Sequence, residues 1–238
     1  MNAIITGSSK GIGYAIAARF IQDGISVALC SRNSAELNKA VESLSAINPS
    51  VKVWGLACDL RNAEDVSSFV NEAQHQLGPI HILVNNAGTY TPGDICTEAE
   101  GTLDYMLGIN LYTAYHTTRA LVPSMKMNPL EQGIRGHIFN MASIAALQAY
   151  PGGGSYSISK YALQGFSKNL REELKPHAIR VSTLYPRATY TDSWIGSGVS
   201  EERIMRGSDI AEMISAILRL SPQCVVEDIV LRPQLGDL

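Results

Sequence analysis

The hydrophobic positions of this chain follow two alternating patterns. Short apolar runs, typical of buried strands, are each followed by a stretch in which apolar residues recur every three or four positions, typical of amphipathic helices. The predicted strands are residues 2–5, 25–30, 51–57, 80–84, 134–141, 179–184 and 225–231. The predicted helices are 34–46, 62–76, 98–125, 155–175 and 208–220, together with a first helix that begins after residue 13. This alternation predicts a parallel sheet with helices on both faces and ligands at the carboxyl ends of the strands.

The first predicted strand leads into a glycine turn, Thr6-Gly7-Ser8-Ser9-Lys10-Gly11-Ile12-Gly13, and then into the first helix. Such a turn lets a phosphate approach backbone N–H groups at the positive end of a helix. The glycines are spaced more widely than in the GxGxxG pattern, so the turn alone is weak evidence. Its position at the first strand–helix junction favours dinucleotide binding.

The residues that follow the second strand discriminate between NAD and NADP. A dinucleotide fold that binds NAD places Asp or Glu there for the ribose 2′-hydroxyl, whereas a 2′-phosphate requires a cation. This chain has Ser31 and Arg32, Lys10 adds a positive charge from the glycine turn, and the nearest acid, Glu36, lies inside the next helix. The charges predict NADP(H), with NAD(H) less favoured, unless both cations are simply solvated surface groups.

A tyrosine and a lysine four residues apart, Tyr156 and Lys160, stand near the start of the predicted helix 155–175. This spacing puts the phenol and the ammonium on one face of a helix. A free tyrosine has a pKa of about 10 and needs one of roughly 7 to donate a proton readily, which a neighbouring cation achieves only in a partly dry cleft. The pair predicts acid–base chemistry, although the same spacing is common on solvated helix faces.

Composition and charge narrow the range of partners. The chain has 238 residues, of which 45% are hydrophobic, and a net charge of −3. These values predict one α/β domain over residues 1–238, without the basic excess that nucleic acid or an anionic membrane would attract. Because charged residues interrupt every apolar run and the first residues already form a strand, we expect no signal peptide, no membrane span and a cytoplasmic location.

The cysteines and histidines carry no metal-binding pattern. Cys30, Cys58, Cys96 and Cys224 lack CxxC spacing, which predicts reduced thiols, two of them buried at strand ends. No two histidines have the spacing of metal ligands, so no metal site is predicted.

Five motifs in order resemble those of the short-chain dehydrogenase/reductase family over nearly the whole chain. They are the glycine turn 6–13, Asn85-Asn86-Ala87-Gly88, Asn110, Ser143, and Tyr156 with Lys160. The resemblance implies a one-domain Rossmann fold with a doubly wound, seven-stranded parallel sheet and a nicotinamide dinucleotide. It also implies a homodimer or homotetramer packed through the helices 98–125 and 155–175, and a catalytic tetrad of Asn110, Ser143, Tyr156 and Lys160.

The same resemblance implies how the site acts, as an NADPH-dependent reductase of a small carbonyl compound. The pro-S hydride of NADPH goes to the carbonyl carbon, Tyr156 protonates the developing alkoxide, and Ser143 donates a hydrogen bond to it. Lys160 lowers the pKa of Tyr156 and binds the nicotinamide ribose, while Asn110 holds a water for proton resupply. The expected cofactor contacts are Gly7, Ser9, Lys10, Gly11, Ile12, Gly13, Arg32, Asp59, Leu60, Asn86, Ala87, Gly88, Tyr156, Lys160, Pro186 and Thr191.

One position departs from the family pattern. The family usually has Pro-Gly after the sixth strand and then a Thr that contacts the nicotinamide carboxamide; here Arg187 follows Pro186, and Thr191 is in register. The Arg187 side chain either crowds the nicotinamide, turns towards the cofactor phosphates, recognises substrate or lies on the surface. The short loop 187–206 predicts an open substrate pocket walled by Ala145, Tyr150, Tyr190 and Trp194.

Other hypotheses refine or oppose this activity. The C-terminal residues 232–238 resemble those of bacterial sepiapterin-reductase-like members of the family. A 3-oxoacyl-[acyl-carrier-protein] reductase is an alternative, although the sequence has no evident cluster of Arg and Lys for an acidic carrier. A non-catalytic NADPH-binding sensor would keep the fold and signal to a partner; the complete tetrad argues against it and Arg187 argues slightly for it.

Overall fold

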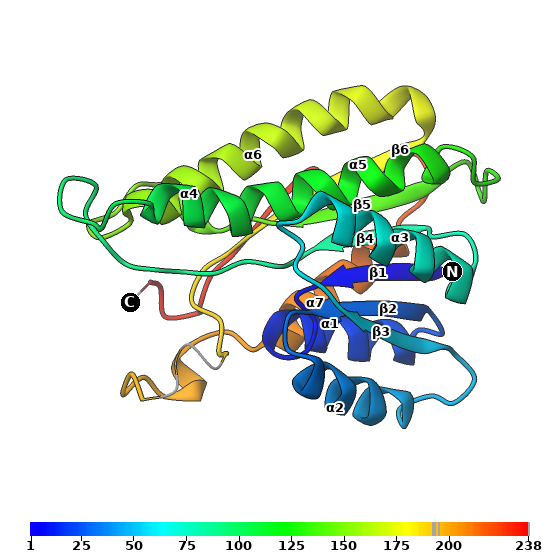
Figure 1. Cartoon of the computed structure of the whole chain (residues 1–238), viewed down its shortest axis with the longest axis horizontal. Coiled ribbons are helices and arrows are strands. Elements are labelled where there is room, and N and C mark those ends of the chain that lie inside the picture. Colours follow the sequence, from blue (N-terminus) through cyan, green and yellow to red (C-terminus); the bar gives the residue numbers. More distant parts are fainter. Residues whose placement is uncertain (192–193, 195, 238) are drawn as a thin grey trace.

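A seven-stranded, all-parallel sheet forms the centre of the molecule (Figure 1). The computed structural model describes residues 1–191, 194 and 196–237. The sheet order is β3-β2-β1-β4-β5-β6-β7, which is the doubly wound arrangement of a Rossmann fold and confirms the predicted fold class. The strands are β1 (Asn2–Thr6), β2 (Ser26–Ser31), β3 (Val53–Ala57), β4 (Ile82–Asn85), β5 (Gly136–Met141), β6 (Ile179–Pro186) and β7 (Asp228–Leu231).

Helices cover both faces of the sheet. One face packs against α1, α2 and α7, and the other against α3, α5 and α6 (Figure 1). The helices are α1 (Gly11–Gln22), α2 (Ser34–Ser45), α3 (Ala63–Leu77), α4 (Thr102–Leu107), α5 (Thr113–Met125), α6 (Gly154–Leu174) and α7 (Gly207–Leu218). Among the described residues, no helix is long and apolar enough to cross a membrane.

Burial on both faces explains the continuous apolar runs of the central strands. In β1, Ile5 belongs to the core beside α1, while its neighbour Ile4 belongs to the core beside α3. Both side chains are fully buried. A strand that is covered on both sides has no solvated face, so its sequence does not alternate between apolar and polar residues.

The predicted continuous helix over residues 98–125 is wrong. The helix begins at Thr102, after Gly101 in a left-handed conformation, and is interrupted by a π-helical turn, Gly108–Tyr112. A π turn holds one residue more than an α turn and is frequent at functional sites. Here it surrounds Asn110, which is buried.

Several boundaries also differ from the prediction. The strands β3, β4, β5 and β7 begin two or three residues later than the apolar runs suggest, because those runs include residues that lead into the sheet without pairing in it. All four cysteines are free, as predicted. Cys30 is buried at the end of β2, whereas Cys58, just after β3, is only half-buried and the other two are exposed, so the prediction of two buried cysteines is wrong for one of them.

Candidate active site

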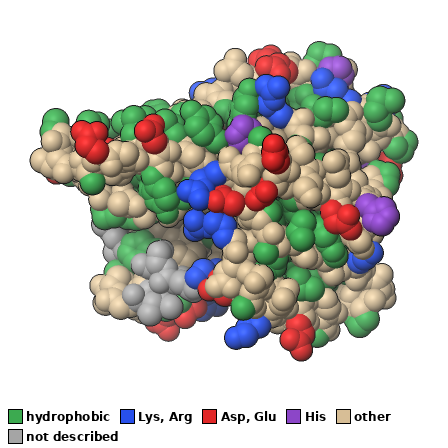
Figure 2. Space-filling view, viewed as in Figure 1, with side chains coloured by type: hydrophobic (Ala, Val, Ile, Leu, Met, Phe, Trp, Pro, Cys, Tyr) green, Lys and Arg blue, Asp and Glu red, His purple; other side chains and the backbone are tan. Residues whose placement is uncertain are grey.

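A cavity of about 1500 Å³ lies along the carboxyl edge of the sheet, formed by the turns that follow β1 to β6. Figure 2 shows the molecule hollowed at this edge, with Lys and Arg side chains beside the hollow. Of the predicted catalytic and cofactor-contacting residues, Gly13 and Asn110 do not line it. Those that line it are Gly7, Ser9, Lys10, Gly11, Ile12, Arg32, Asp59, Leu60, Asn86, Ala87, Gly88, Ser143, Tyr156, Lys160, Pro186 and Thr191.

The glycine turn presents the first turn of α1 to the cavity. Gly7 and Gly11 have φ values of +63° and +60°, in the left-handed region that favours glycine. A Cβ at Gly7 would lie 2.8 Å from the Cα of Ala87, and one at Gly13 would lie 2.5 Å from the carbonyl oxygen of Gly7. Gly13 thus lets α1 pack onto the turn, and the open backbone at the helix N-terminus fits the pyrophosphate of a dinucleotide.

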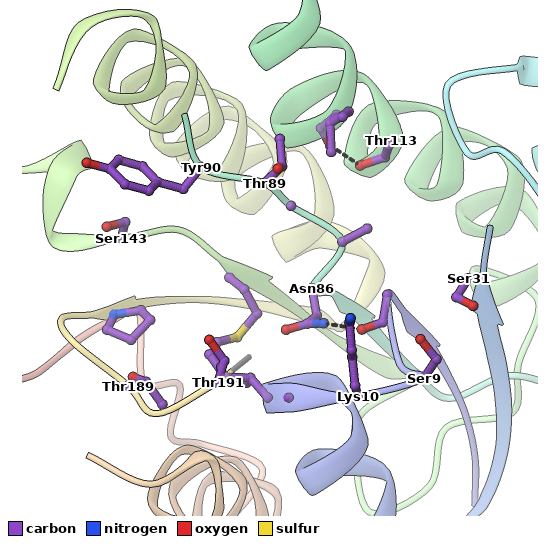
Figure 3. Close-up of a pocket in the computed structure, with 18 of the residues that line it drawn as sticks. Ser9, Lys10, Ser31, Asn86, Thr89, Tyr90, Thr113, Ser143, Thr189 and Thr191 are labelled. Carbon is purple, nitrogen blue, oxygen red and sulfur yellow. Dashed lines mark hydrogen bonds between the residues drawn. The ribbon is translucent and has the colours of Figure 1, made fainter. Parts of the chain in front are cut away.

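Asn86 fastens the end of β4 to this turn (Figure 3). Its side-chain amide donates to the carbonyl oxygens of Thr6 and Gly7, both at 2.9 Å. In return, the hydroxyl of Thr6 accepts the backbone N–H groups of Asn86 at 2.9 Å and Ala87 at 3.0 Å. These hydrogen bonds brace the end of β4 against the glycine turn.

Charged side chains gather where β2 and β3 end. Arg32, Glu36, Asp59 and Arg61 all line the cavity there. Arg61 donates from Nε to the two carboxylate oxygens of Asp59 at 3.0 and 3.1 Å, and this bond, helped by the charge of Arg32, holds the pKa of Asp59 below its usual value against the effect of burial. Arg61 is not predicted from the sequence, where its only signal is its place two residues after Asp59.

Ser143, Tyr156 and Lys160 meet at the other end of the cavity. Ser143 follows β5, and the other two lie in the first turns of α6. The Ser143 hydroxyl lies near enough to the Tyr156 phenol to act on its pKa, and the Nζ of Lys160 lies 5.9 Å from the centre of the Tyr156 ring. Lys160 also donates to the carbonyl oxygen of Met141 at 3.0 Å. The predicted face-sharing of phenol and ammonium is confirmed.

Burial dominates the ionisation of this pair. It raises the pKa of Tyr156, while the neighbouring Ser143 hydroxyl and the charge of Arg187 act in the lowering direction. It also lowers the pKa of Lys160 to about 8. The prediction of a lowered Tyr156 pKa is thus wrong for the chain alone, because desolvation of the phenolate outweighs the Ser143 hydroxyl and the charge of Arg187.

Asn110 lies behind the cavity wall and connects three segments. Its Oδ1 accepts the N–H of Thr89 at 2.8 Å, and its Nδ2 donates to the carbonyl oxygen of Thr89 at 3.0 Å and to the hydroxyl of Ser159 at 2.9 Å. A Cβ at Gly88 would lie 3.1 Å from Asn110 Oδ1 and 3.5 Å from Lys160 Nζ. Asn110 therefore fixes the strand end and α6 on either side of Lys160.

Aromatic side chains surround the Tyr156 phenol. Tyr150 and Trp194 line the cavity as predicted, whereas Ala145 and Tyr190 are not among its described lining residues. Tyr90, which is not predicted from the sequence, lies edge-on to Tyr156 with ring centres 4.8 Å apart. Its sequence signal is weak, because it is one aromatic residue shortly after the motif 85–88.

Comparison with known proteins identifies the family. Residues 1–200 match the family model described as short chain dehydrogenase. The chain belongs to this family. It is 39% identical over 186 residues to dehydrogenase/reductase SDR family member 4 from Oryctolagus cuniculus, which covers 77% of this chain and 68% of that protein.

Solved structures of the family are similar over the whole chain. An alcohol dehydrogenase from Thermococcus sibiricus, complexed with 5-hydroxy-NADP, has a TM-score of 0.88 and 27% identity, covering 100% of this chain and 98% of that one. L-sorbose reductase from Gluconobacter frateurii, complexed with NADPH and L-sorbose, has a TM-score of 0.87 and 28% identity, covering 97% and 94%. The chain is thus an oxidoreductase of this family with a cavity that fits a nicotinamide cofactor.

Proposed function

We propose that this member of the family is an NADPH-dependent reductase that converts a small carbonyl compound to an alcohol, with Tyr156 as the acid/base. The observation that carries the proposal is the meeting of Ser143, Tyr156 and Lys160 in one cavity with the glycine turn. Acid–base chemistry at a phenol needs a partly dry site with a nearby cation, and both conditions hold around Tyr156.

The charges of the cavity favour NADPH over NADH. Lys10 and Arg32 line it at the positions where a 2′-phosphate requires cations, and Arg61, which is paired with Asp59, lines it as well. Glu36 also lines the cavity, but its N–H is fixed by the side chain of Asn33, the N-cap of α2. Two of the similar solved structures are complexes with NADP compounds, which supports the same choice.

The side chains divide the work of the reaction. NADPH supplies the hydride that reduces the carbonyl carbon. Tyr156, kept protonated by burial, donates its proton to the developing alkoxide while the Ser143 hydroxyl donates a hydrogen bond to the same oxygen. The ammonium of Lys160 stabilises the phenolate that remains. Asn110 fixes the segments on either side of Lys160, so that Lys160 stays in position to resupply the proton.

The test is oxidation of NADPH and NADH with diketones, aromatic aldehydes, pterins and a short 3-oxoacyl thioester. Tyr156→Phe should lower turnover by at least about 100-fold and change NADPH affinity much less, because it removes the proton donor but only one of many expected cofactor contacts. Tyr161→Phe is the matched control, since Tyr161 lies in the same helix with an exposed side chain. Turnover that survives in Tyr156→Phe would disprove the acid/base role, and tight NADPH binding with no turnover would favour a sensor.

We also propose that the chain forms a homodimer or homotetramer through α5 and α6. The exposed aromatic side chains Tyr112 and Tyr115, just before and in the α5 segment, and Tyr161 in α6 support this. Light scattering coupled to gel filtration tests it: a monomeric mass at micromolar concentration would contradict it.

A further inference from the structure

Arg187 occupies a fixed position at the substrate side of the cavity. It directly follows β6, and its backbone N–H donates to the carbonyl oxygen of Leu231 in β7 at 2.9 Å. Its side chain lines the cavity and is 23% exposed. The guanidinium therefore extends from the rigid edge of the sheet into the cavity, which excludes a purely surface role.

The charge of Arg187 faces the aromatic wall and the reacting phenol. Its guanidinium carbon lies 5.6 Å from the centre of the Tyr150 ring. Its charge also acts to lower the pKa values of both Tyr150 and Tyr156, so it lies within electrostatic range of the phenol that donates the proton. A ligand group held at Arg187 would thus lie beside Tyr150, a short distance from the reacting centre.

The C-terminal segment holds the guanidinium by one side. Figure 1 shows this segment (red) on the same side of the molecule as the loop that follows β6. Asp237 Oδ1 lies 3.2 Å from Arg187 Nε, and the other oxygen of Asp237 pairs with Arg232. Arg203 donates to the carbonyl oxygens of Leu235, Gly236 and Asp237, which keeps Asp237 in place.

This arrangement leaves part of the guanidinium available for a ligand. Asp237 is paired with Nε, and among the described residues no ion pair or side-chain hydrogen bond involves the two Nη groups of Arg187. A guanidinium presents several N–H donors in a planar fork that matches a carboxylate. Because Asp237 already offsets part of the positive charge, a planar monoanion fits the remaining charge better than a dianion does.

We propose that Arg187 binds a carboxylate of the substrate, so that the enzyme reduces an oxo acid to a hydroxy acid. The proposal rests on the reductase function above. The substrate carboxylate lies on the free side of the guanidinium next to Tyr150, while the carbonyl oxygen lies at Tyr156 and Ser143. The carbonyl gains a hydride from NADPH and a proton from Tyr156, and the carboxylate is unchanged.

The test compares each acid with its neutral methyl ester. Levulinate and acetoacetate are assayed beside methyl levulinate and methyl acetoacetate with NADPH, in the wild type and in Arg187→Gln, Arg187→Lys and Asp237→Asn. Arg219→Gln is the control, because Arg219 is the C-cap of α7 and its side chain bonds only to Ser215 among the described residues. Each acid and its methyl ester differ in charge and in little else.

The wild type should prefer the acids, and Arg187→Gln should lower kcat/KM for them by about 10- to 100-fold while changing the ester values much less. Arg187→Lys should restore part of the loss, since it returns the charge without the fork. Asp237→Asn should lower KM for the acids, because it removes a competing carboxylate. Arg219→Gln should match the wild type.

Equal losses for acids and esters, or a raised KM for NADPH in Arg187→Gln, would overturn the proposal and assign Arg187 to the cofactor. A wild type that prefers the esters would overturn it while leaving the reductase function standing. If nothing is turned over, the reductase function fails, and the carboxylate site is then judged by levulinate binding to the NADPH-loaded protein. Binding that is lost in Arg187→Gln supports the site, and identical behaviour of the two proteins overturns it.

Discussion

Lys160 is a buried cation, and the loss of hydration on burial lowers the stability of the folded protein. Burial lowers its pKa from 10.5 to about 8. At one pKa unit per 1.36 kcal/mol, a difference of about 2.5 units amounts to roughly 3 kcal/mol of unfolding free energy near neutral pH. The hydrogen bond to the Met141 carbonyl offsets part of it. The buried Lys160 thus lowers the unfolding free energy, as is expected of a residue whose role is chemical.

Lys160→Met should therefore raise the free energy of unfolding at about pH 7 by roughly 1 to 3 kcal/mol, although it removes a site residue. Because the folded pKa is depressed, the unfolded chain binds more protons between about pH 8 and 10.5, and wild-type stability rises across that window. The advantage of the variant should shrink accordingly and vanish above it. Urea unfolding at both ends of the window measures this, with the exposed Lys39→Met as the control. A pH-independent difference would contradict it.

The sequence was a good guide to which residues meet and a poor guide to their ionisation. Ser143, Tyr156 and Lys160 were found because motif spacing and strand ends determine their positions. The raised pKa of Tyr156 was missed because the extent of burial depends on the whole cavity wall, including Tyr90. Arg61 and Tyr90 have no local pattern that separates them from surface residues, so only the folded structure identifies them.

At the scale of elements, two helical glycines differ in the space around them: Gly13 has no room for a side chain and Gly165 has. A Cβ at Gly13 in α1 would lie 2.5 Å from the Gly7 carbonyl oxygen, whereas one at Gly165 in α6 would meet nothing within 4 Å. Alanine is favoured over glycine in helices by about 1 kcal/mol. Gly165→Ala should therefore stabilise the protein by about 0.5 to 1 kcal/mol.

Gly13→Ala should instead destabilise the protein and weaken NADPH binding, because the clash displaces the glycine turn from α1. Chemical unfolding and NADPH fluorescence titration of the two variants test the pair. Wild-type stability and affinity in Gly13→Ala would show that the turn can shift freely, and the close packing of Gly13 would then have no role in the site.

The π-helical turn is held by the hydrogen bonds of Asn110. In Asn110→Asp the carboxylate still accepts the Thr89 N–H but cannot donate to the Thr89 carbonyl or to Ser159. We expect a loss of about 2 to 4 kcal/mol in unfolding free energy, from two lost bonds and a buried charge. Asn169→Asp is the control, because Asn169 is exposed and, within the part of the chain that the structure describes, its side chain bonds only to Gly165. Equal stabilities of the two variants would show that the turn does not depend on Asn110.

Sequence patterns predicted the order and type of the elements but not this interruption. Apolar residues continue through it, with Leu107 before the turn and Leu111 within it, so the stripe gives no sign of the inserted residue. One extra residue changes the hydrogen bonding and not the hydrophobicity, and period analysis detects only the latter. The late starts of β3 and β7 have a related cause, since strand ends are determined by pairing partners.

At the scale of the whole molecule, the sheet order places two kinds of chemistry at one edge. The order reverses between β1 and β4, and a doubly wound sheet binds its ligands in the crevice at such a reversal. The strands β2 and β3 on one side supply Arg32 and Arg61, and β5 and β6 on the other lead to Ser143 and Arg187. A dinucleotide across the crevice would thus have its phosphorylated ribose near Arg32 and Arg61 and its nicotinamide near Ser143 and Arg187.

The preference for NADPH or NADH should therefore be measurable as an increase in the Tm of the whole protein. A ligand at 100 times its Kd stabilises the folded state by about 2.7 kcal/mol, which for a chain of this size corresponds to a Tm increase of roughly 5 to 10 °C. We expect that increase with NADPH and a smaller one with NADH at equal concentration. Arg32→Gln should bring the NADPH value down to that of NADH and leave NADH unchanged, whereas Lys39→Gln, an exposed change in the adjoining helix α2, should alter neither. Equal increases with both cofactors in the wild type would mean that the cations at the ends of β1 and β2 do not select a 2′-phosphate. In that case Glu36, which lines the same cavity, would be the side chain positioned to bind a ribose hydroxyl.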